Sequence, residues 1–187
     1  MPIVLASSSP RRQELLKNAG IEFVVRPANI PELRKENEPP LVFAARMAAE
    51  KARVVWTGTR TGHVLGADTI VVVDELVLGK PENPEDAARM LRQLSGRKHQ
   101  VITGVCLIGN EFEDVRSETT AVHFSALSDT DIRDYIGTGE PMDKAGAYAI
   151  QGAAARWISK IEGDYSNVVG LPVTLVLKML REHLIGD

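Results

Sequence analysis

The first 25 residues constrain the fold of the chain more than any other segment. An apolar run at residues 3–6 predicts a short buried strand, and Ser9-Pro10 predicts a helix with Ser9 as its N-cap and Pro10 as its first residue. Gly20 predicts the end of that helix, and the apolar run 21–25 predicts a second strand. A strand–helix–strand order is typical of an α/β domain in which some strands are parallel, so we expect this fold class.

The rest of the chain continues this alternation of helices and strands. Periodicity and capping residues predict further helices at about 41–55, from Asn83-Pro84 to near Gly96, from Ser128 to Gly137, and at 171–184. Apolar runs predict further strands at 63–73, 76–78, 99–108, 113–124 and 157–161. We expect loops at the proline-punctuated residues 27–40, the glycine- and alanine-rich residues 137–156 and the polar residues 163–167.

Length and composition exclude several classes of protein. The chain has 187 residues, which is typical of one domain, so we expect a single domain over residues 1–187. A formal net charge of −3 argues against a nucleic-acid-binding protein that acts through bulk positive charge. A lone cysteine, Cys106, excludes a secreted disulfide scaffold. No run approaches the ~18 apolar residues of a membrane span, and the start lacks secretory features, so we expect a cytoplasmic protein that contacts no membrane.

Two cations occupy an unfavourable place in the first predicted helix. Arg11 and Arg12 lie in its first turn, whereas Glu85 and Asp86 occupy the same turn of the other proline-started helix. The positive N-terminus of a helix prefers acids, and cations there cost roughly 0.3–1 kcal/mol each. A bound anion would reverse the sign of this effect, with hydroxyl donors from the serines 7–9 nearby. The alternative is a pair of solvated arginines on a surface helix.

Asp68 is a carboxylate within the strongly apolar segment 66–73. Burying a carboxylate is costly unless it is paired, bound to a metal or placed at the mouth of the strand. Burial raises the pKa of a carboxyl group, and a metal or a basic neighbour lowers it. Either environment suits a general base or a metal ligand. The alternative is a structural aspartate that caps a neighbouring turn, and the residue pattern leaves both open.

Three further features are weak when each is taken alone. Asp74-Glu75 predicts a hairpin turn between the strands 63–73 and 76–78, and Lys80 follows this hairpin within reach of a phosphate. Lys51 lies in an alanine-rich helix, but most lysines in such places are solvated. The small residues of segment 143–152 let backbone approach a ligand, and Gln151 within it offers both a donor and an acceptor. Three familiar signatures are absent: the P-loop, the dinucleotide-binding G-x-G-x-x-G and the nucleophile elbow.

Taken together and in order over nearly the whole chain, these segments resemble the Maf family of nucleoside-triphosphate pyrophosphatases. The matching motifs are LASSSPRR (5–12), EKA (50–52), GADT (66–69), GKP (79–81), LSG (94–96), TGV (103–105), YI with GEP (135–141), DKAGAYAIQG (143–152) and GDYSNVVGLP (163–172). Each motif is weak alone, whereas the ordered set is highly specific. Two positions depart from the usual family pattern: Pro31, where an acid often precedes Glu32, and Ala154, where glycine is common.

The resemblance implies an α/β fold with a twisted mixed β-sheet flanked by helices, two lobes with an active-site cleft between them, and often a homodimer. It implies hydrolysis of a nucleoside triphosphate to the monophosphate and pyrophosphate with a divalent cation, Mg²⁺ or Mn²⁺. Asp68 matches the family's proton acceptor, and we expect it to bind the metal together with Glu32. The remaining positions expected to bind the phosphates or their surroundings are Ser7, Arg12, Lys51 and Lys80.

Three positions discriminate between two groups within the family. Arg11, Thr69 and Gln151 resemble the group that acts on thymidine and uridine triphosphates, whereas a sister group acting on 7-methyl-guanosine triphosphate tends to have Trp, Gln and Glu there. A glutamine amide matches the donor and acceptor of uracil or thymine, and a glutamate accepts from the donor edge of guanine. We therefore expect hydrolysis of dTTP and UTP in the removal of unwanted pyrimidine nucleotides. The alternatives are the sister specificity and a nucleotide-binding regulator of septum formation with little turnover.

Overall fold

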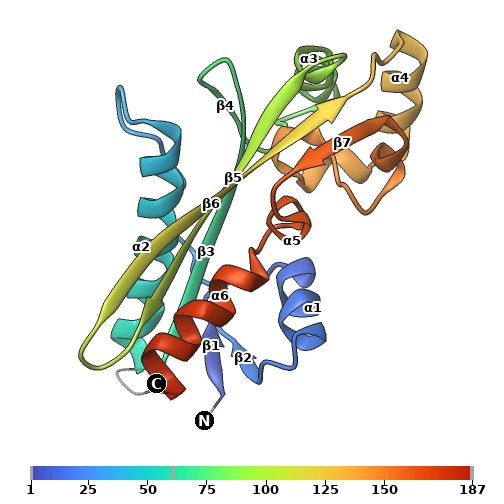
Figure 1. Ribbon diagram of the computed structural model, residues 1–187. Helices are drawn as coiled ribbons and strands as arrows, with labels where there is room; N and C mark the ends of the chain where they lie inside the picture. The colour runs from blue at the N-terminus through green and yellow to red at the C-terminus, as the bar shows by residue number, and fades with distance from the viewer. Residues whose placement is uncertain (1, 60–61, 186–187) are drawn as a thin grey trace. The chain divides into compact units, whose positions relative to one another are not determined.

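The α/β class expected from the sequence is confirmed. The structure, a computed structural model, describes residues 2–59 and 62–185 (Figure 1). Its strands are β1 (Ile3–Leu5), β2 (Phe23–Val25), β3 (Val64–Val73), β4 (Leu76–Leu78), β5 (Lys98–Ile108), β6 (Glu113–Phe124) and β7 (Ile158–Glu162). Its α-helices are α1 (Pro10–Asn18), α2 (Pro40–Thr59), α3 (Pro84–Leu94), α4 (Asp129–Gly137), α5 (Tyr165–Val169) and α6 (Val173–Leu180). None of the described helices is long and apolar enough to cross a membrane.

The described strands form one mixed sheet, as predicted. Their order is β2-β1-β3-β5-β6-β7, and β4 pairs with β3 outside this path. β1 is parallel to both β2 and β3, whereas the pairs β3–β4 and β6–β7 are antiparallel. Helix α1 connects β1 to β2, which is the kind of crossover that a parallel pair requires.

The chain divides into two compact units, and the three long strands contribute residues to both. Unit 1 comprises the described residues of Met1–Thr69, Thr103–Glu118 and Gly170–Asp187, and unit 2 comprises Ile70–Ile102 and Thr119–Val169. Each unit has its own hydrophobic core, with one buried cluster in unit 2 and two in unit 1 among the described residues. A single domain over residues 1–187 and a cleft between two lobes stay predictions.

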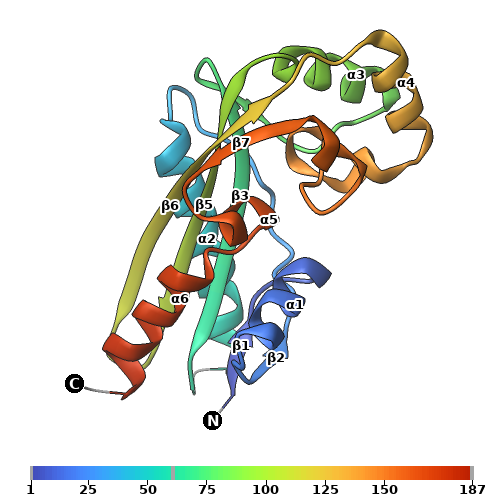
Figure 2. The same cartoon turned by 45° about the vertical axis from the view of Figure 1, so that its right-hand side comes forward.

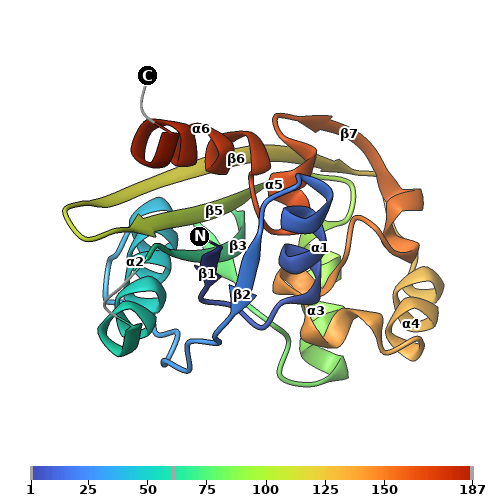
Figure 3. The same ribbon diagram turned by 90° about the horizontal axis from the view of Figure 1, so that it is seen from below.

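In unit 1, helices cover both faces of the sheet (Figures 1 and 3). Successive side chains of a strand point to opposite faces, so neighbouring residues of β3 join different clusters. Leu65 packs in a cluster with Leu16 of α1 and Met179 of α6. Val64 packs in another cluster with Ala48 of α2. In the part of β3 that belongs to unit 1, the even-numbered residues therefore face α2, and the odd-numbered residues face α1 and α6.

Two glycines let α2 lie unusually close to the sheet. A Cβ atom on Gly66 would meet the Ala48 carbonyl oxygen at 2.3 Å, and one on Gly104 would meet the Ala44 carbonyl oxygen at 2.2 Å. On the helix side, the small residues Ala44, Ala48 and Ala52 are spaced four apart and form one face. The close approach therefore depends on small residues in both layers.

Unit 2 has its own core. It contains β4, β7 and the remaining parts of β3, β5 and β6, with α3 and α4 side by side (Figure 2). Leu91 of α3, Tyr135 of α4 and Phe124 of β6 belong to one buried cluster. Trp157 completes this cluster, and its ring meets Tyr135 edge to face with ring centroids 5.2 Å apart.

The structure differs from the sequence predictions at segments too short to show a period. Residues 137–156, predicted as loop, contain three short 3₁₀ helices, Glu140–Asp143, Ala145–Ala147 and Ala153–Trp157. Part of the polar turn 163–167 is helix α5. A helix of three to five residues gives no readable hydrophobic period, which explains both differences.

Candidate active site

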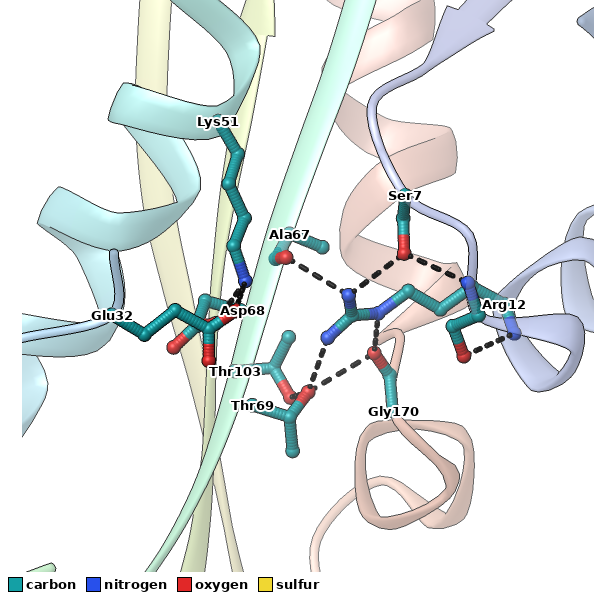
Figure 4. A network of polar contacts seen from close by, with 10 residues as sticks. Ser7, Arg12, Glu32, Lys51, Ala67, Asp68, Thr69, Thr103 and Gly170 are labelled. Atoms are coloured by element: carbon teal, nitrogen blue, oxygen red, sulfur yellow. Dashed lines mark hydrogen bonds and ion pairs between the residues drawn. The ribbon is translucent and has the colours of Figure 1, made fainter. Parts of the chain in front are cut away.

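Lys51 joins two carboxylates on the α2 side of unit 1. Its Nζ lies 2.6 Å from Oδ1 of Asp68 and 2.6 Å from Oε1 of Glu32 (Figure 4). Lys51 and Asp68 are buried, whereas the Glu32 side chain is 50% exposed. Asp68 follows Gly66 by two residues on β3, so it points to the same face, toward α2. The structure thus brings together three residues that the sequence predicted for one site.

The surroundings of Asp68 suit a proton acceptor. Burial raises the pKa of its carboxyl group above the usual 3.8, while Lys51 and Arg12 oppose part of this rise. A carboxylate with a raised pKa binds a proton more tightly than an exposed aspartate does, which is what a general base requires. The hydrogen-bond partner of Asp68 is the Lys51 ammonium rather than the backbone of a turn, so the capping alternative is not supported.

The loop that carries Glu32 is anchored to α2 by Arg46. The Arg46 guanidinium donates to the Leu33 carbonyl at 2.9 Å and to the two carboxylate oxygens of Glu38 at 2.6 and 2.8 Å. It also donates to Glu50 at 2.9 Å. The hydrogen bond from Arg46 lowers the pKa of Glu38 to about 2, so this anchor is ionised at neutral pH. Because Arg46 holds Leu33, the residue next to Glu32, the Glu32 side chain has fewer ways to approach Lys51.

Arg12 lies on the other side of β3 and is buried (Figure 4). Its Nε donates to the Gly170 carbonyl at 2.8 Å, and its Nη1 donates to Ser7 Oγ at 3.1 Å and to the Ala67 carbonyl at 2.9 Å. Its Nη2 donates to Thr69 Oγ1 at 3.0 Å. These four bonds occupy four of the five N–H groups of a guanidinium, and every acceptor is a neutral oxygen.

Burial lowers the pKa of Arg12, but an arginine starts so high that the side chain stays cationic at neutral pH. The alternative of two solvated arginines is therefore wrong for Arg12, which is 9% exposed, whereas its neighbour Arg11 is half-buried. The expected N-cap is confirmed, because Ser9 Oγ accepts from the Arg12 backbone N–H at 3.5 Å.

The reason that Arg12 turns inward lies in the sheet. β1 ends at Leu5, opposite Leu65 of β3, and the Leu65 carbonyl accepts from the next residue, Ala6. The Ala67 carbonyl points to the same side of β3, beyond the end of β1. The Arg12 guanidinium donates to this carbonyl, so it takes the place of the backbone N–H that a longer β1 would supply.

Ser7 and Thr69, both predicted site residues, frame the guanidinium. Ser7 Oγ also accepts from the Ser9 backbone N–H at 3.2 Å. Thr69 Oγ1 lies 3.1 Å from the Gly170 carbonyl oxygen and 2.9 Å from Oγ1 of Thr103 on β5. Ser7, Arg12 and Thr69 are therefore brought together on one side of β3 within unit 1.

Lys80 and Gln151 belong to unit 2, and both are exposed. The residue before Lys80, Gly79, accepts at its carbonyl from the Gly146 backbone N–H at 3.0 Å. The strand end that carries Lys80 is thereby joined to the segment that carries Gln151. Joint action of these two residues with those of unit 1 stays a prediction.

Some residues of these networks carry no sequence-based prediction. They are Glu38, Arg46 and Thr103, all in unit 1. The spacing of Arg46 and Glu50 on one helix was a readable signal, because residues four apart are neighbours. The pairing of Arg46 with Glu38, outside the helix, had no local signal.

The fold and the site define a class of protein: an α/β protein with a buried lysine between two acids on one side of a strand and a buried arginine on the other. A sequence profile of the Maf-like proteins matches residues 2–183. The chain therefore belongs to the Maf-like family, and the resemblance read from its motifs is confirmed.

Curated relatives cover nearly the whole chain. A protein of Koribacter versatilis (strain Ellin345) is 55% identical over 181 residues, which are 97% of this chain and 94% of the relative. One of Symbiobacterium thermophilum is 52% identical over 180 residues, 96% of this chain and 93% of the relative. One of Geobacter sulfurreducens is 49% identical over 181 residues, 96% and 95% of the two chains. All three relatives bear the name dTTP/UTP pyrophosphatase.

Two solved structures align with nearly the full length of the chain at low similarity. A nucleoside-triphosphatase, dITP/XTP pyrophosphatase, of Mycobacterium abscessus has 16% identity and a TM-score of 0.48, with 99% of this chain and 97% of that chain covered. The Staphylococcus aureus Ham1 protein has 14% identity and a TM-score of 0.49, with 97% and 99% covered. Scores this low carry no argument about function.

Proposed function

We propose that this protein hydrolyses dTTP and UTP to the monophosphate and pyrophosphate, in the removal of unwanted pyrimidine nucleotides. The observation that carries the proposal is the buried pair of Lys51 and Asp68, with Glu32 on the same ammonium. Family membership and relatives at 55% and 52% identity, both named for this activity, support it.

Asp68 is the proton acceptor of the proposed reaction. Water attacks the α-phosphorus, Asp68 takes the proton from that water, and pyrophosphate leaves. Such a step develops charge on the phosphoryl oxygens, so fixed cations are the main source of catalysis. Lys51 holds the Asp68 carboxylate in place through its 2.6 Å contact.

Arg12 and Lys80 are the proposed cations for the phosphates. Four hydrogen bonds to neutral oxygens hold Arg12 in place, so it acts on an anion chiefly through its charge. Lys80 is exposed at the end of β4, where its flexible stem lets the ammonium follow a phosphate. Ser7 contributes by holding Arg12, through the 3.1 Å bond to Nη1.

The donor set of Glu32 and Asp68 fits a hard divalent cation. Both carboxylates already approach one positive charge, the Lys51 ammonium, and carboxylate oxygens are the ligands that Mg²⁺ and Mn²⁺ prefer. Glu32 and Asp68 would hold the ion, which supplies charge neutralisation at phosphate oxygens. Calorimetry of Mn²⁺ binding tests this assignment. Glu32→Gln should weaken Mn²⁺ binding, and Glu111→Gln, at an exposed residue outside the cluster, should leave it unchanged.

Gln151 is the proposed base-reading residue, with Arg11 and Thr69 as further specificity positions. Gln151→Glu should lower kcat/KM for dTTP and UTP by about 5–150-fold. The carbonyl of the bound base then loses its donor, and an unpaired acceptor that binding has buried costs roughly 1–3 kcal/mol. Activity on 7-methyl-GTP should fall less or rise, since guanine presents donors to a carboxylate. The exposed Gln100 gives a matched control, Gln100→Glu. An equal loss on all three nucleotides would show that Gln151 does not read the base.

Pyrophosphate release over a panel of triphosphates, with Mg²⁺ and with Mn²⁺, tests the proposed function itself. Preferred turnover of dTTP and UTP supports it. Preferred turnover of 7-methyl-GTP would favour the sister specificity. Binding of pyrimidine nucleotides without turnover would favour the septum regulator. A homodimer, a cytoplasmic location and a cleft between two lobes remain predictions, of which sedimentation analysis tests the first.

A further inference from the structure

The side chain proposed to read the base stands on a short turn. Gly152 donates its backbone N–H to the Ala149 carbonyl at 3.1 Å, which closes a turn with Ile150 and Gln151 at its corners. Ile150 is buried and Gln151 is exposed. A side chain on an exposed turn reaches a ligand reproducibly only if the turn itself is held.

Two side chains hold the backbone on both sides of this turn. The Ala149 N–H, at its start, donates to the hydroxyl of Tyr135 at 3.2 Å. The Ala153 N–H, just after it, donates to Glu140 Oε2 at 3.3 Å. The Tyr135 hydroxyl in turn donates to Glu140 Oε1 at 2.8 Å, so the two holding groups are themselves joined.

The packing around this pair leaves little freedom. Tyr135 is 1% exposed, and its ring meets Trp157 edge to face. A Cβ atom on Gly152 would lie 1.9 Å from Glu140 Oε1, so the carboxylate rests directly on the backbone of the turn. The pKa of Tyr135 is raised by burial and by its bond to Glu140, so the hydroxyl keeps its proton and remains a donor.

We propose that Tyr135 and Glu140 are positioning residues for base selection: together they fix the turn that carries Gln151, and so decide how well uracil and thymine are distinguished from other bases. This inference rests on the proposed function, in which Gln151 reads the base. Neither residue touches the nucleotide in this proposal, because both act through the backbone at Ala149 and Ala153.

A double-mutant cycle tests the proposal. Tyr135→Phe removes the hydroxyl that bonds to both Ala149 and Glu140, and Gln151→Ala removes the reading group. The measured quantity is the ratio of kcat/KM for UTP to that for CTP, which present different donor and acceptor patterns to one amide. Tyr165→Phe, at an exposed tyrosine of α5, is the matched control.

We expect Tyr135→Phe to lower the UTP/CTP ratio by about 2- to 12-fold, the value of one neutral hydrogen bond, with most of the loss in KM for UTP. Tyr165→Phe should leave the ratio unchanged. In the Gln151→Ala background, Tyr135→Phe should change the ratio no further, because the turn then has nothing to position. Equal effects in both backgrounds would overturn the proposal and leave the proposed function standing.

Amide hydrogen exchange gives a readout that does not depend on turnover. Tyr135→Phe should speed exchange at Ala149, and Glu140→Ala should speed it at Ala153, each by about 2- to 12-fold. Unchanged exchange at both amides would overturn the proposal that Tyr135 and Glu140 hold the turn, even if the wild type is active. Conversely, a wild type that does not turn over dTTP or UTP overturns the proposed function, whatever the exchange shows.

Discussion

Lys51 and Arg12 are both buried cations beside β3, yet the groups that contact their charges differ. Lys51 contacts two carboxylates, those of Asp68 and Glu32, on the α2 side of the strand. Arg12, on the other side, ends its four hydrogen bonds on neutral hydroxyl and carbonyl oxygens. A cation paired with acids has little charge left to attract an anion, whereas one held by neutral dipoles keeps its full charge.

The difference indicates that the two sides of β3 suit different chemical roles. The side with Lys51 holds a carboxylate in a low-dielectric setting and so suits proton transfer. The side with Arg12 presents a positive charge whose hydrogen bonds all end on neutral oxygens, and so suits a phosphate. Variants at each side should therefore fail in different ways.

The largest effect is expected from Asp68→Asn, which removes the charge on the Lys51 side and keeps the size of the side chain. Turnover should fall by about 10²–10⁴-fold, the usual consequence of losing a general base. The measurement is pyrophosphate release at saturating dTTP. Asp74→Asn, at a residue whose side chain is 72% exposed, is the control and should be unaffected. Wild-type turnover by a folded Asp68→Asn protein would refute the assignment.

Lys51→Met should destabilise the fold by about 3–5 kcal/mol at pH 7, because it leaves a buried carboxylate without its cation. The loss should be smaller at pH 5. Without Lys51 the folded-state pKa of Asp68 rises further above the unfolded value, the folded state binds the extra proton, and stability falls as pH rises through that window. Urea unfolding at the two pH values tests this, with Lys178→Met, 66% exposed, as control. A pH-independent loss would contradict the ion-pair description.

Arg12→Lys keeps the charge but removes the planar guanidinium, which donates to four oxygen acceptors. The free energy of unfolding should fall by about 1–3 kcal/mol, since carbonyl groups are left without a donor. The loss should be the same at pH 5 and pH 7, because every acceptor is neutral. The exposed Arg26 supplies the control, Arg26→Lys. If the apo protein kept its full stability, the structural bonds of Arg12 would contribute nothing.

The smallest effect concerns the titration of Asp68. Because burial raises its pKa, ¹³C NMR of the metal-free protein should place the carboxyl midpoint above 3.8. Lys51→Met should move the midpoint further up, whereas Arg12→Lys should move it little, since the charge at that position is kept. A midpoint at or below the usual value would show that Lys51 outweighs burial.

Local features of the sequence predicted their own structure well. Ser9 and Asn83 begin helices as expected, and Asp74 and Glu75 make the two-residue turn between β3 and β4. Asp68 in an apolar strand indicated a carboxylate in an unusual environment, and the structure shows it buried and paired with Lys51. Each of these depends on neighbours within a few residues, which a sequence displays directly.

The environment of Arg12 could not be predicted in the same way. A cation near an anion was the prediction, which stays a prediction; the sequence did not show that Arg12 also donates to the Ala67 carbonyl, 55 residues away. That contact depends on where β1 stops beside β3, which is a property of strand register. The anchor of Arg46 on Glu38 and the pair of Tyr135 and Glu140 likewise join segments by tertiary packing.

The glycines under α2 have a consequence for the electrostatics of the site. Gly66 and Gly104 set the depth at which the helix rests on the sheet, and Lys51 reaches Asp68 at 2.6 Å from that depth. A single methyl group at Gly104, which carries no charge, would lift the helix and lengthen the ion pair. The proton affinity of Asp68 is therefore adjustable by side-chain volume alone, at a position that touches neither charged group.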